Sequence, residues 1–227
     1  EKFFSSSECG KNIQAGRIHY FKLENDDGLL LTTGDNRSDQ PSKKAQEDNS
    51  IFGKIIFFSL NDKKQRIFSK GHRNPQGLFV ENNLILSTEH GPKGGDEINK
   101  IILDKNYGWP ISSYGESYFD TNLMYNKSHN KYNFEEPIFA YTPSIGISEI
   151  IKLPNSFSNK WFDNYLVSSL NGKSLYRIKF DRNYTKILYQ EKIFIGDRIR
   201  DLKFSKSLNA IFLALEDRGE LGIITLE

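Results

Sequence analysis

The stretch EHGPKGGDEIN (89–99) concentrates groups that could bind a cation. It follows the apolar run LILST and holds three glycines, a proline and three acidic residues within eleven positions. Glycine permits positive φ and close backbone approach, so GP followed by KGG can turn main-chain carbonyls toward a metal ion. The alternative is a solvated acidic turn without a ligand. The residues alone leave both interpretations open.

Two arginines near the C-terminus could bind an anion. Arg198 and Arg200, in GDRIRDL, alternate along a predicted strand and therefore point to the same face. Two guanidinium groups on one face repel each other unless an anion lies between them, and a carboxylate suits bidentate pairing with arginine. Salt bridges to Asp197 or Asp201 are the structural alternative.

Composition limits the class of protein. The 227 residues suffice for one sizeable core, or for part of a larger one. Lys+Arg 31 against Asp+Glu 29 leaves a net charge of +2, which argues against a nucleic-acid partner. Cys9 is the only cysteine, so an intrachain disulfide and a cysteine-based zinc site are excluded. No apolar run approaches the roughly 18 residues of a membrane span, and EKFFSSSECG is not a signal peptide.

Periodicity predicts an all-β protein. Short segments rich in β-branched and aromatic residues are bounded by turn signals such as ENDDG, LNGK and EDRG. No stretch sustains a helical pattern over three turns, although residues 155–164 could hold one helical turn. Paired strands at about ten-residue spacing suit a propeller, a sandwich or a barrel. The expected strands are 17–23, 28–34, 54–60, 77–88, 149–153, 164–170, 174–180, 186–194, 210–216 and 221–227.

Two long irregular segments, 34–52 and 105–136, interrupt this rhythm. Loops of such length are usually functional or disordered. The first is charged and polar enough to be mobile, whereas the second carries too many aromatic residues for a purely solvated loop. No charged or Gly/Ser-rich linker divides the chain, so we expect one domain over residues 1–227.

Three motifs in register carry a resemblance to a known family. GHRNPQGL (71–78), STEHGPKGGDEIN (87–99) and NYGWP (106–110) resemble the signature of the soluble pyrroloquinoline quinone (PQQ)-dependent aldose sugar dehydrogenases, the glucose/sorbosone dehydrogenase family. Weaker likenesses extend along nearly the whole chain. The resemblance implies a six-bladed β-propeller, of which this chain would be roughly the last four blades, truncated at the N-terminus and open at that edge.

The resemblance also implies a function. Members oxidise aldose sugars at the anomeric carbon to lactones by hydride transfer to PQQ, with Ca²⁺ as the second cofactor. The implied partners are an aldose substrate and an unknown electron acceptor, and a homodimer is possible. Family members are typically periplasmic or secreted, which implies the same localisation here.

Calcium ligands are among the roles that the resemblance assigns. The carbonyls of Gly91 and Pro92 would hold the Ca²⁺ beside the quinone, and Asp96 would accept a hydrogen bond near the cofactor. Glu97 and the carbonyl of Tyr107 match a second, structural calcium site.

Other residues are implied to contact the quinone itself. Arg73 and Asn74 would reach its reactive carbonyl oxygens, where charge develops as hydride arrives. A capped turn is the structural alternative for this pair, as a plain turn serine is for Ser144. The implied cofactor-binding residues are Arg73, Asn74, His90, Asp96, Ser144, Arg198 and Arg200.

The sequence departs from the family pattern at the general base. In the family, a histidine three residues before a Gly-Arg dipeptide takes the proton of the anomeric hydroxyl, since its pKa lies near the working pH. Here the segment reads GKNIQAGRI, and Ile13 occupies that position. Isoleucine cannot take a proton, and His19 lies six residues further on. A lysine of the glucose-type enzymes is also replaced, by Asn171, although Lys173 is close.

Three interpretations therefore stay open. The chain is a working PQQ sugar dehydrogenase with a shifted or weak base, a non-catalytic propeller that binds calcium as a binding module, or an incomplete family fragment. The replaced base favours the second interpretation, because holding a cofactor and using it require different residues.

Overall fold

The computed structural model describes residues 5–8, 10, 15–36, 43–118, 122 and 124–226, so Ile13 lies outside the described residues. The chain divides into two compact units, Glu1–Pro143 and Ser144–Glu227, and each is described by itself. That both units form one domain stays a prediction. The described elements are strands, apart from the short 3₁₀ helices η1 (Lys43–Gln46) and η2 (Asn130–Tyr132), which confirms the all-β prediction. No helix in these ranges is long and apolar enough to cross a membrane.

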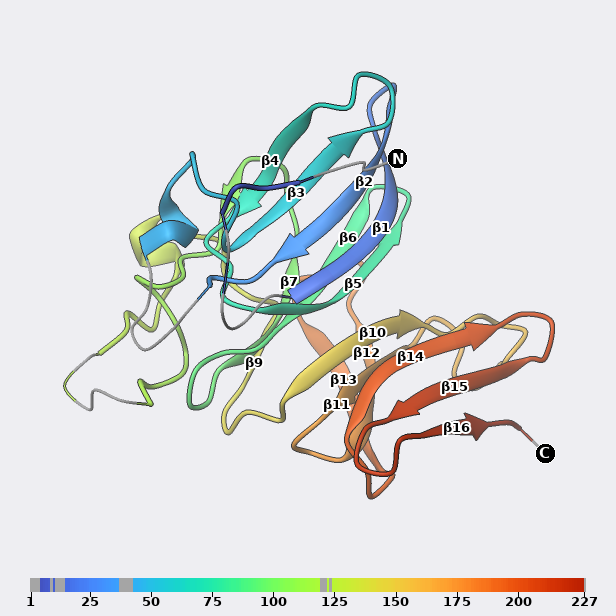
Figure 1. Ribbon diagram of the computed structural model, residues 1–227. Helices are drawn as coiled ribbons and strands as arrows, with labels where there is room; N and C mark the ends of the chain where they lie inside the picture. The colour runs from blue at the N-terminus through green and yellow to red at the C-terminus, as the bar shows by residue number, and fades with distance from the viewer. Residues whose placement is uncertain are drawn as a thin grey trace. The chain divides into compact units, whose positions relative to one another are not determined.

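The first unit contains two sheets, with strand orders β1-β2-β3-β4-β8 and β5-β6-β7-β9 (Figure 1). Neighbouring strands are antiparallel except β4 and β8. Alternate residues of β2 and β3, such as Leu30, Ile55 and Phe57, point to one face and pack with Leu78 and Ile85 of the second sheet. The strands are β1 (Ala15–Leu23), β2 (Asp26–Thr33), β3 (Lys54–Ser59), β4 (Gln65–Lys70), β5 (Pro75–Glu81), β6 (Leu84–Glu89), β7 (Asp96–Lys100), β8 (Lys105–Asn106) and β9 (Phe139–Tyr141).

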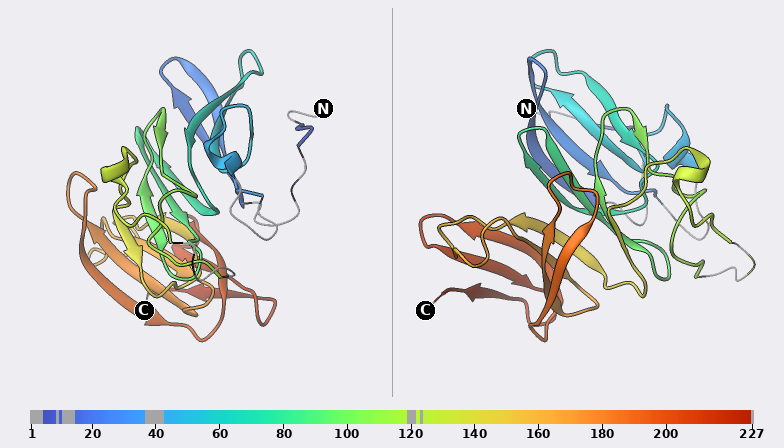
Figure 2. Two further views of the ribbon diagram at one scale, coloured as in Figure 1. Left: turned by 90° about the vertical axis from the view of Figure 1, so that its left-hand side faces the viewer. Right: turned by 180° about the vertical axis from the view of Figure 1, so that it is seen from behind.

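The second unit also contains two sheets, both antiparallel, with orders β10-β11-β12-β13 and β14-β15-β16. Figure 2 shows these strands from two further sides. Their core is mostly aliphatic and includes Leu166, Leu175, Ile199 and Leu213. The strands are β10 (Ile147–Lys152), β11 (Tyr165–Ser169), β12 (Ser174–Phe180), β13 (Ile187–Phe194), β14 (Ile199–Ser205), β15 (Ala210–Leu215) and β16 (Glu220–Ile224).

Most predicted strands are present, with ends within three residues of the prediction. The predicted segment 77–88 is two strands, β5 and β6, joined by a turn in which Asn82 has φ +53°. The expected helical turn at 155–164 is a series of hydrogen-bonded turns without a helix. Strands β4, β7, β8 and β9 were not predicted, because their sequences are short or polar and depend on sheet neighbours. The number of propeller blades stays a prediction.

A carboxylate closes the hairpin between β12 and β13. Asp181 accepts hydrogen bonds from the backbone N–H groups of Thr185 (2.7 Å) and Lys186 (3.0 Å), and from the Thr185 hydroxyl (2.9 Å). Partial desolvation raises the pKa of Asp181, but these hydrogen bonds outweigh it and lower the pKa from 3.8 to about 2. The charged carboxylate therefore stabilises the folded hairpin.

We expect Asp181→Ala to lower the urea midpoint of unfolding at pH 7, because two backbone donors lose their acceptor. This loss of stability should have its full size above pH 3.8 and should shrink as the pH falls toward about 2, because the folded state stabilises only the ionised carboxylate. Arg182→Ala, on the same turn, serves as the control. An equal loss at pH 7 and near pH 2 would contradict this linkage.

Candidate functional site

The turn between β6 and β7 is shaped by its glycines. A Cβ on Gly91 would lie 2.1 Å from the carbonyl oxygen of Gly95, and one on Gly95 (φ +72°) would lie 2.3 Å from the Gly115 nitrogen. Only glycine fits such positions. The Gly91 N–H donates to Oδ1 of Asp96 (3.1 Å). Asp96 and Glu97 were expected on the turn but are the first residues of β7, so pairing with β9 fixes their directions.

This turn borders a small cavity of about 10 Å³, which is room for one water molecule or one ion. Two buried polar atoms of its lining, Ser112 Oγ and His129 Nε2, have no hydrogen-bond partner among the described residues. His129 Nε2 lies 3.8 Å from Oε1 of Glu97. A bound cation or water would satisfy these atoms. The lining residues are Arg73, Glu89, His90, Gly91, Gly95, Glu97, Tyr107, Trp109, Ser112, Ser113 and His129.

Burial shifts the pKa values of two ionisable groups beside the cavity, Glu97 and His129. Burial, and next the neighbouring carboxylate of Glu89, raise the pKa of Glu97 well above its usual value, although the Asn99 amide donates to it (3.2 Å). Burial lowers the pKa of His129, so its ring is neutral. His129 Nδ1 lies 3.3 Å from the carbonyl oxygen of Glu135, and donation there leaves Nε2 as an acceptor or metal ligand.

The carboxylate of Glu89 binds both the backbone of Arg73 and the imidazole ring of His72. Its Oε1 accepts from the N–H of Arg73 (2.6 Å), and its Oε2 lies 2.9 Å from Nδ1 of His72. Nε2 of His72 lies 2.8 Å from the Ser69 hydroxyl, and the imidazole stacks on the ring of Tyr107 at 4.6 Å. The motifs placed Glu89 and His72 in this region, but no role for either could be read from the sequence.

The guanidinium group of Arg73 is held by backbone and aromatic contacts. Its Nη1 donates to the carbonyl of His90 (3.0 Å), and its Cζ lies 5.4 Å from the ring centroid of Trp109. The indole N–H of Trp109 donates to Oδ2 of Asp35 (2.6 Å), whose own N–H donates to the Arg73 carbonyl (2.9 Å). Arg73 is 7% exposed, so its charge acts in a largely dry setting.

Asn74 continues this cluster. Its carbonyl accepts from the N–H of His90 (3.1 Å), and its Oδ1 accepts from the Gln76 amide (2.9 Å). The first unit thus brings together eight of the predicted site residues, by a shared cavity, a direct hydrogen bond or sequence adjacency. They are Arg73, Asn74, His90, Gly91, Pro92, Asp96, Glu97 and Tyr107.

In the second unit, Arg198 and Arg200 share one acidic partner. Nε of Arg198 donates to Oε1 of Glu216 (3.2 Å), and Nε of Arg200 donates to Oε2 of the same carboxylate (2.8 Å). The strand alternation correctly places the two arginines on one face. The group between them is the carboxylate of Glu216, so they form salt bridges as in the structural alternative, but with a different acidic residue. The alternative partner Asp197 is wrong, because Asp197 accepts from Arg218 instead (2.7 Å).

The other predicted residues of the second unit have partners of their own or lie at its start. Lys173 was considered as a substitute for the family lysine whose position Asn171 occupies. Its Nζ lies 2.6 Å from Asp217, so Lys173 already has an acidic partner. Ser144 is half-buried before β10. The contact of these residues with PQQ stays a prediction.

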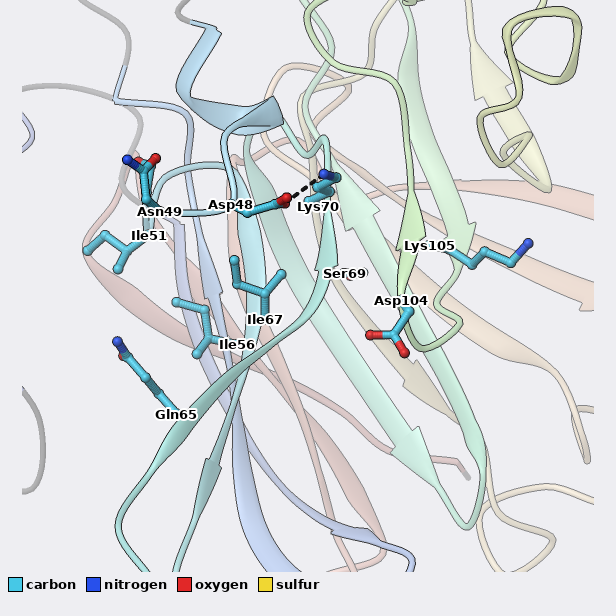
Figure 3. Close-up of a pocket in the computed structure, with 11 residues that line it drawn as sticks. Asp48, Asn49, Ile51, Ile56, Gln65, Ile67, Ser69, Lys70, Asp104 and Lys105 are labelled. Atoms are coloured by element: carbon cyan, nitrogen blue, oxygen red, sulfur yellow. Dashed lines mark hydrogen bonds and ion pairs between the residues drawn. The ribbon is translucent and has the colours of Figure 1, made fainter.

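A larger cavity, of about 440 Å³, lies beside β3 and β4 (Figure 3). Ile51, Ile56 and Ile67 give it an apolar part, and the ion pair of Asp48 with Lys70 (2.6 Å) lies at its edge. Its lining contains none of the predicted site residues. The small cavity is therefore the candidate site.

Known proteins resemble this chain over most of its length. Its sequence matches the Glucose / Sorbosone dehydrogenase family over residues 5–222. Aldose sugar dehydrogenase YliI of Escherichia coli (strain K12) is 28% identical over 210 residues, which cover 85% of this chain and 55% of that protein. Quinoprotein glucose dehydrogenase B of Acinetobacter calcoaceticus is 26% identical over 217 residues, which cover 72% of this chain and 45% of that protein. The chain thus spans about half the length of these relatives.

Solved structures share the fold. A glucose dehydrogenase matches with a TM-score of 0.79 at 25% identity, over 99% of this chain and 68% of that one. The PQQ-bound aldose sugar dehydrogenase of Streptomyces coelicolor matches with a TM-score of 0.63 at 21% identity, over 88% and 55% of the two chains. The motifs that form the small cavity lie within the matched residues, and the chain belongs to the Glucose / Sorbosone dehydrogenase family.

Proposed function

We propose that this chain holds PQQ and Ca²⁺ and oxidises an aldose sugar at the anomeric carbon to the lactone. The observation that carries the proposal is the small cavity, where Ser112 and His129 present unsatisfied polar atoms beside the buried carboxylate of Glu97 and the fixed guanidinium of Arg73. Family membership and the names of the relatives, aldose sugar dehydrogenase and quinoprotein glucose dehydrogenase, support the substrate class and the quinone. The same membership supports a periplasmic or secreted location.

The residues present fit a hard cation held mostly by neutral oxygens. No group of three or more His, Cys, Asp or Glu side chains that could hold a metal exists in the described ranges. A calcium ion would therefore rest on the carboxylate of Glu97 and on main-chain carbonyls, for which we propose those of Gly91, Pro92 and Tyr107. Burial and the neighbouring carboxylate of Glu89 raise the pKa of Glu97, and a bound cation would favour its charged form.

The reaction moves a hydride from the anomeric carbon and a proton from its hydroxyl. PQQ, when bound, supplies the two-electron acceptor for that hydride. Arg73, held over Trp109, would stabilise the negative charge that develops on the acceptor oxygen, and Asn74 would donate a hydrogen bond there. Ile13 cannot receive the hydroxyl proton, so this proton must pass to water or to another residue. We therefore expect slow turnover.

Calcium should raise the thermal stability of the protein. At a free concentration of 100 times Kd, binding to the folded state alone adds about 2.7 kcal/mol. Glu97→Gln keeps the shape of the side chain but removes its charge, so most of this gain should disappear. Thermal unfolding with Ca²⁺ or EDTA measures the gain, and Glu116→Gln, an exposed acid on a nearby loop, is the control. An equal calcium gain in wild type and Glu97→Gln would contradict the assignment.

A non-catalytic binding module is the second candidate, and the isoleucine at position 13 favours it. Reduction of a redox dye by aldoses, with PQQ and Ca²⁺ present, separates the two. Sugar-dependent dye reduction supports the dehydrogenase. Binding of Ca²⁺, with or without PQQ, but without any dye reduction supports the module. The absence of both Ca²⁺ and PQQ binding refutes both candidates.

A further inference from the structure

Lys54, the first residue of β3, is a fully buried lysine. Its Nζ donates to the carbonyls of Lys44 (2.8 Å), Ala45 (3.0 Å) and Phe52 (2.7 Å). All three donors of the ammonium group are therefore used. Burial, and next the charge of Lys70, lower its pKa to about 8, so the group is still mostly protonated at pH 7. A buried cation is costly unless it is fully hydrogen-bonded, and this one is.

The three carbonyls belong to η1 and the residues after it, which we call the 43–52 segment. Part of this segment packs under Trp109, since Ala45 forms a buried cluster with Trp109 and Tyr125. The Ala45 carbonyl also accepts from the N–H of Gly71 (3.0 Å), directly before the His-Arg-Asn motif. The sequence predicted a mobile loop over 34–52, and for the described residues 43–52 that prediction is wrong.

Gln46 extends the same contacts to the NYGWP motif. Its Nε2 donates to the carbonyl of Trp109 (2.6 Å), and its Oε1 accepts from the side-chain amide of Asn106 (2.7 Å). Further along the 43–52 segment, Asp48 pairs with Lys70 of β4 (2.6 Å), as Figure 3 shows. The 43–52 segment is thus attached to β3 and β4 through Lys54 and Lys70. It is attached to Trp109 through Ala45 and Gln46.

We propose that Lys54 is a positioning residue for the site around Arg73. Its ammonium group acts as an internal cation that fixes the 43–52 segment, and this segment holds Trp109 in place against the Arg73 guanidinium. Loss of the three hydrogen bonds would loosen the segment, and with it the aromatic face under the arginine. The expected effect on PQQ rests on the proposed function, whereas the effect on Trp109 does not.

Lys54→Met tests the proposal, because methionine matches the apolar stem and removes all three hydrogen bonds. In a Trp161→Phe background, Trp109 is the only tryptophan, so fluorescence reports on it alone. We expect the acrylamide quenching constant of Trp109 to rise about twofold or more through local opening. The Kd for PQQ should rise about tenfold, which corresponds to 1.4 kcal/mol.

The control is Ile55→Ala, which removes a buried neighbour on the opposite face of β3 and destabilises the same sheet. It should leave Trp109 quenching unchanged. Gln46→Met, in the half-buried part of the segment, repeats the test if Lys54→Met does not fold, and it should also raise quenching. Unchanged quenching in both segment variants, or an equal rise in Ile55→Ala, overturns the proposal. If wild type does not bind PQQ, the proposed function fails while the quenching comparison still decides the role of Lys54.

Discussion

Arg73→Met is expected to lower kcat/KM for sugar oxidation by about 10²–10³-fold, the usual cost of losing one donor that stabilises transition-state charge. The methionine keeps an apolar stem against Trp109 but removes the guanidinium that lies 5.4 Å from the indole ring. The fold should tolerate the change, because the hydrogen bond to Glu89 comes from the backbone N–H of residue 73, which the substitution keeps. Steady-state dye reduction with saturating PQQ and Ca²⁺ measures the effect.

Arg66→Met is the matched control, since Arg66 is an exposed arginine of the same unit and its Nη2 pairs with Oδ2 of Asp104 at 2.9 Å. Arg73→Lys should restore little activity, because an ammonium group lacks the planar fork that stacks on an indole and donates in two directions. Full activity in Arg73→Met would remove this arginine from the proposed chemistry.

Ile13→His should raise the turnover number by about 10²–10⁴-fold if only the general base is missing. The expectation comes from the H-x-x-G-R pattern of the resembled family, in which the histidine precedes the dipeptide that is Gly16 and Arg17 here. The gain should follow the deprotonation of an imidazole, so activity should rise as the pH increases through about 6.5.

A pH profile of kcat is the measurement, with Gln14→His as the control for a histidine at the neighbouring position. A gain in Gln14→His as large as that in Ile13→His would contradict a specific base role. An unchanged rate in an Ile13→His protein that binds PQQ would show that more than the base has been lost.

The strand pattern of this fold is readable from local sequence where short runs are rich in β-branched and aromatic residues and are bounded by turns. β3 and β12 are such runs, and both were predicted within one residue of their ends. β7 begins with Asp96 and Glu97 after two glycines, so local chemistry indicates a turn. Its strand character comes from pairing with β6 and β9, which single-segment reasoning does not see.

The candidate site was predictable where motifs carry it and not where distant residues complete it. The glycine turn follows directly from EHGPKGGDEIN, because only glycine fits at Gly91 and Gly95. His129 is remote in sequence from Glu97, and its burial beside the cavity depends on how the 105–136 segment folds back. A polar segment around Gln46 suggests mobility until the buried ammonium of Lys54 is seen to hold it.

The central claim is that this chain binds PQQ through calcium and Arg73, and an equilibrium titration tests it most directly. PQQ is added to the Trp161→Phe protein in Ca²⁺, and the fluorescence of Trp109, which lies against Arg73, is followed. We predict saturable 1:1 quenching with a Kd at or below about 1 μM, equivalent to about −8.2 kcal/mol. Quenching should disappear in EDTA and weaken strongly in Arg73→Met. No saturable quenching at micromolar PQQ, or binding that is the same with Ca²⁺ and with EDTA, would contradict the account.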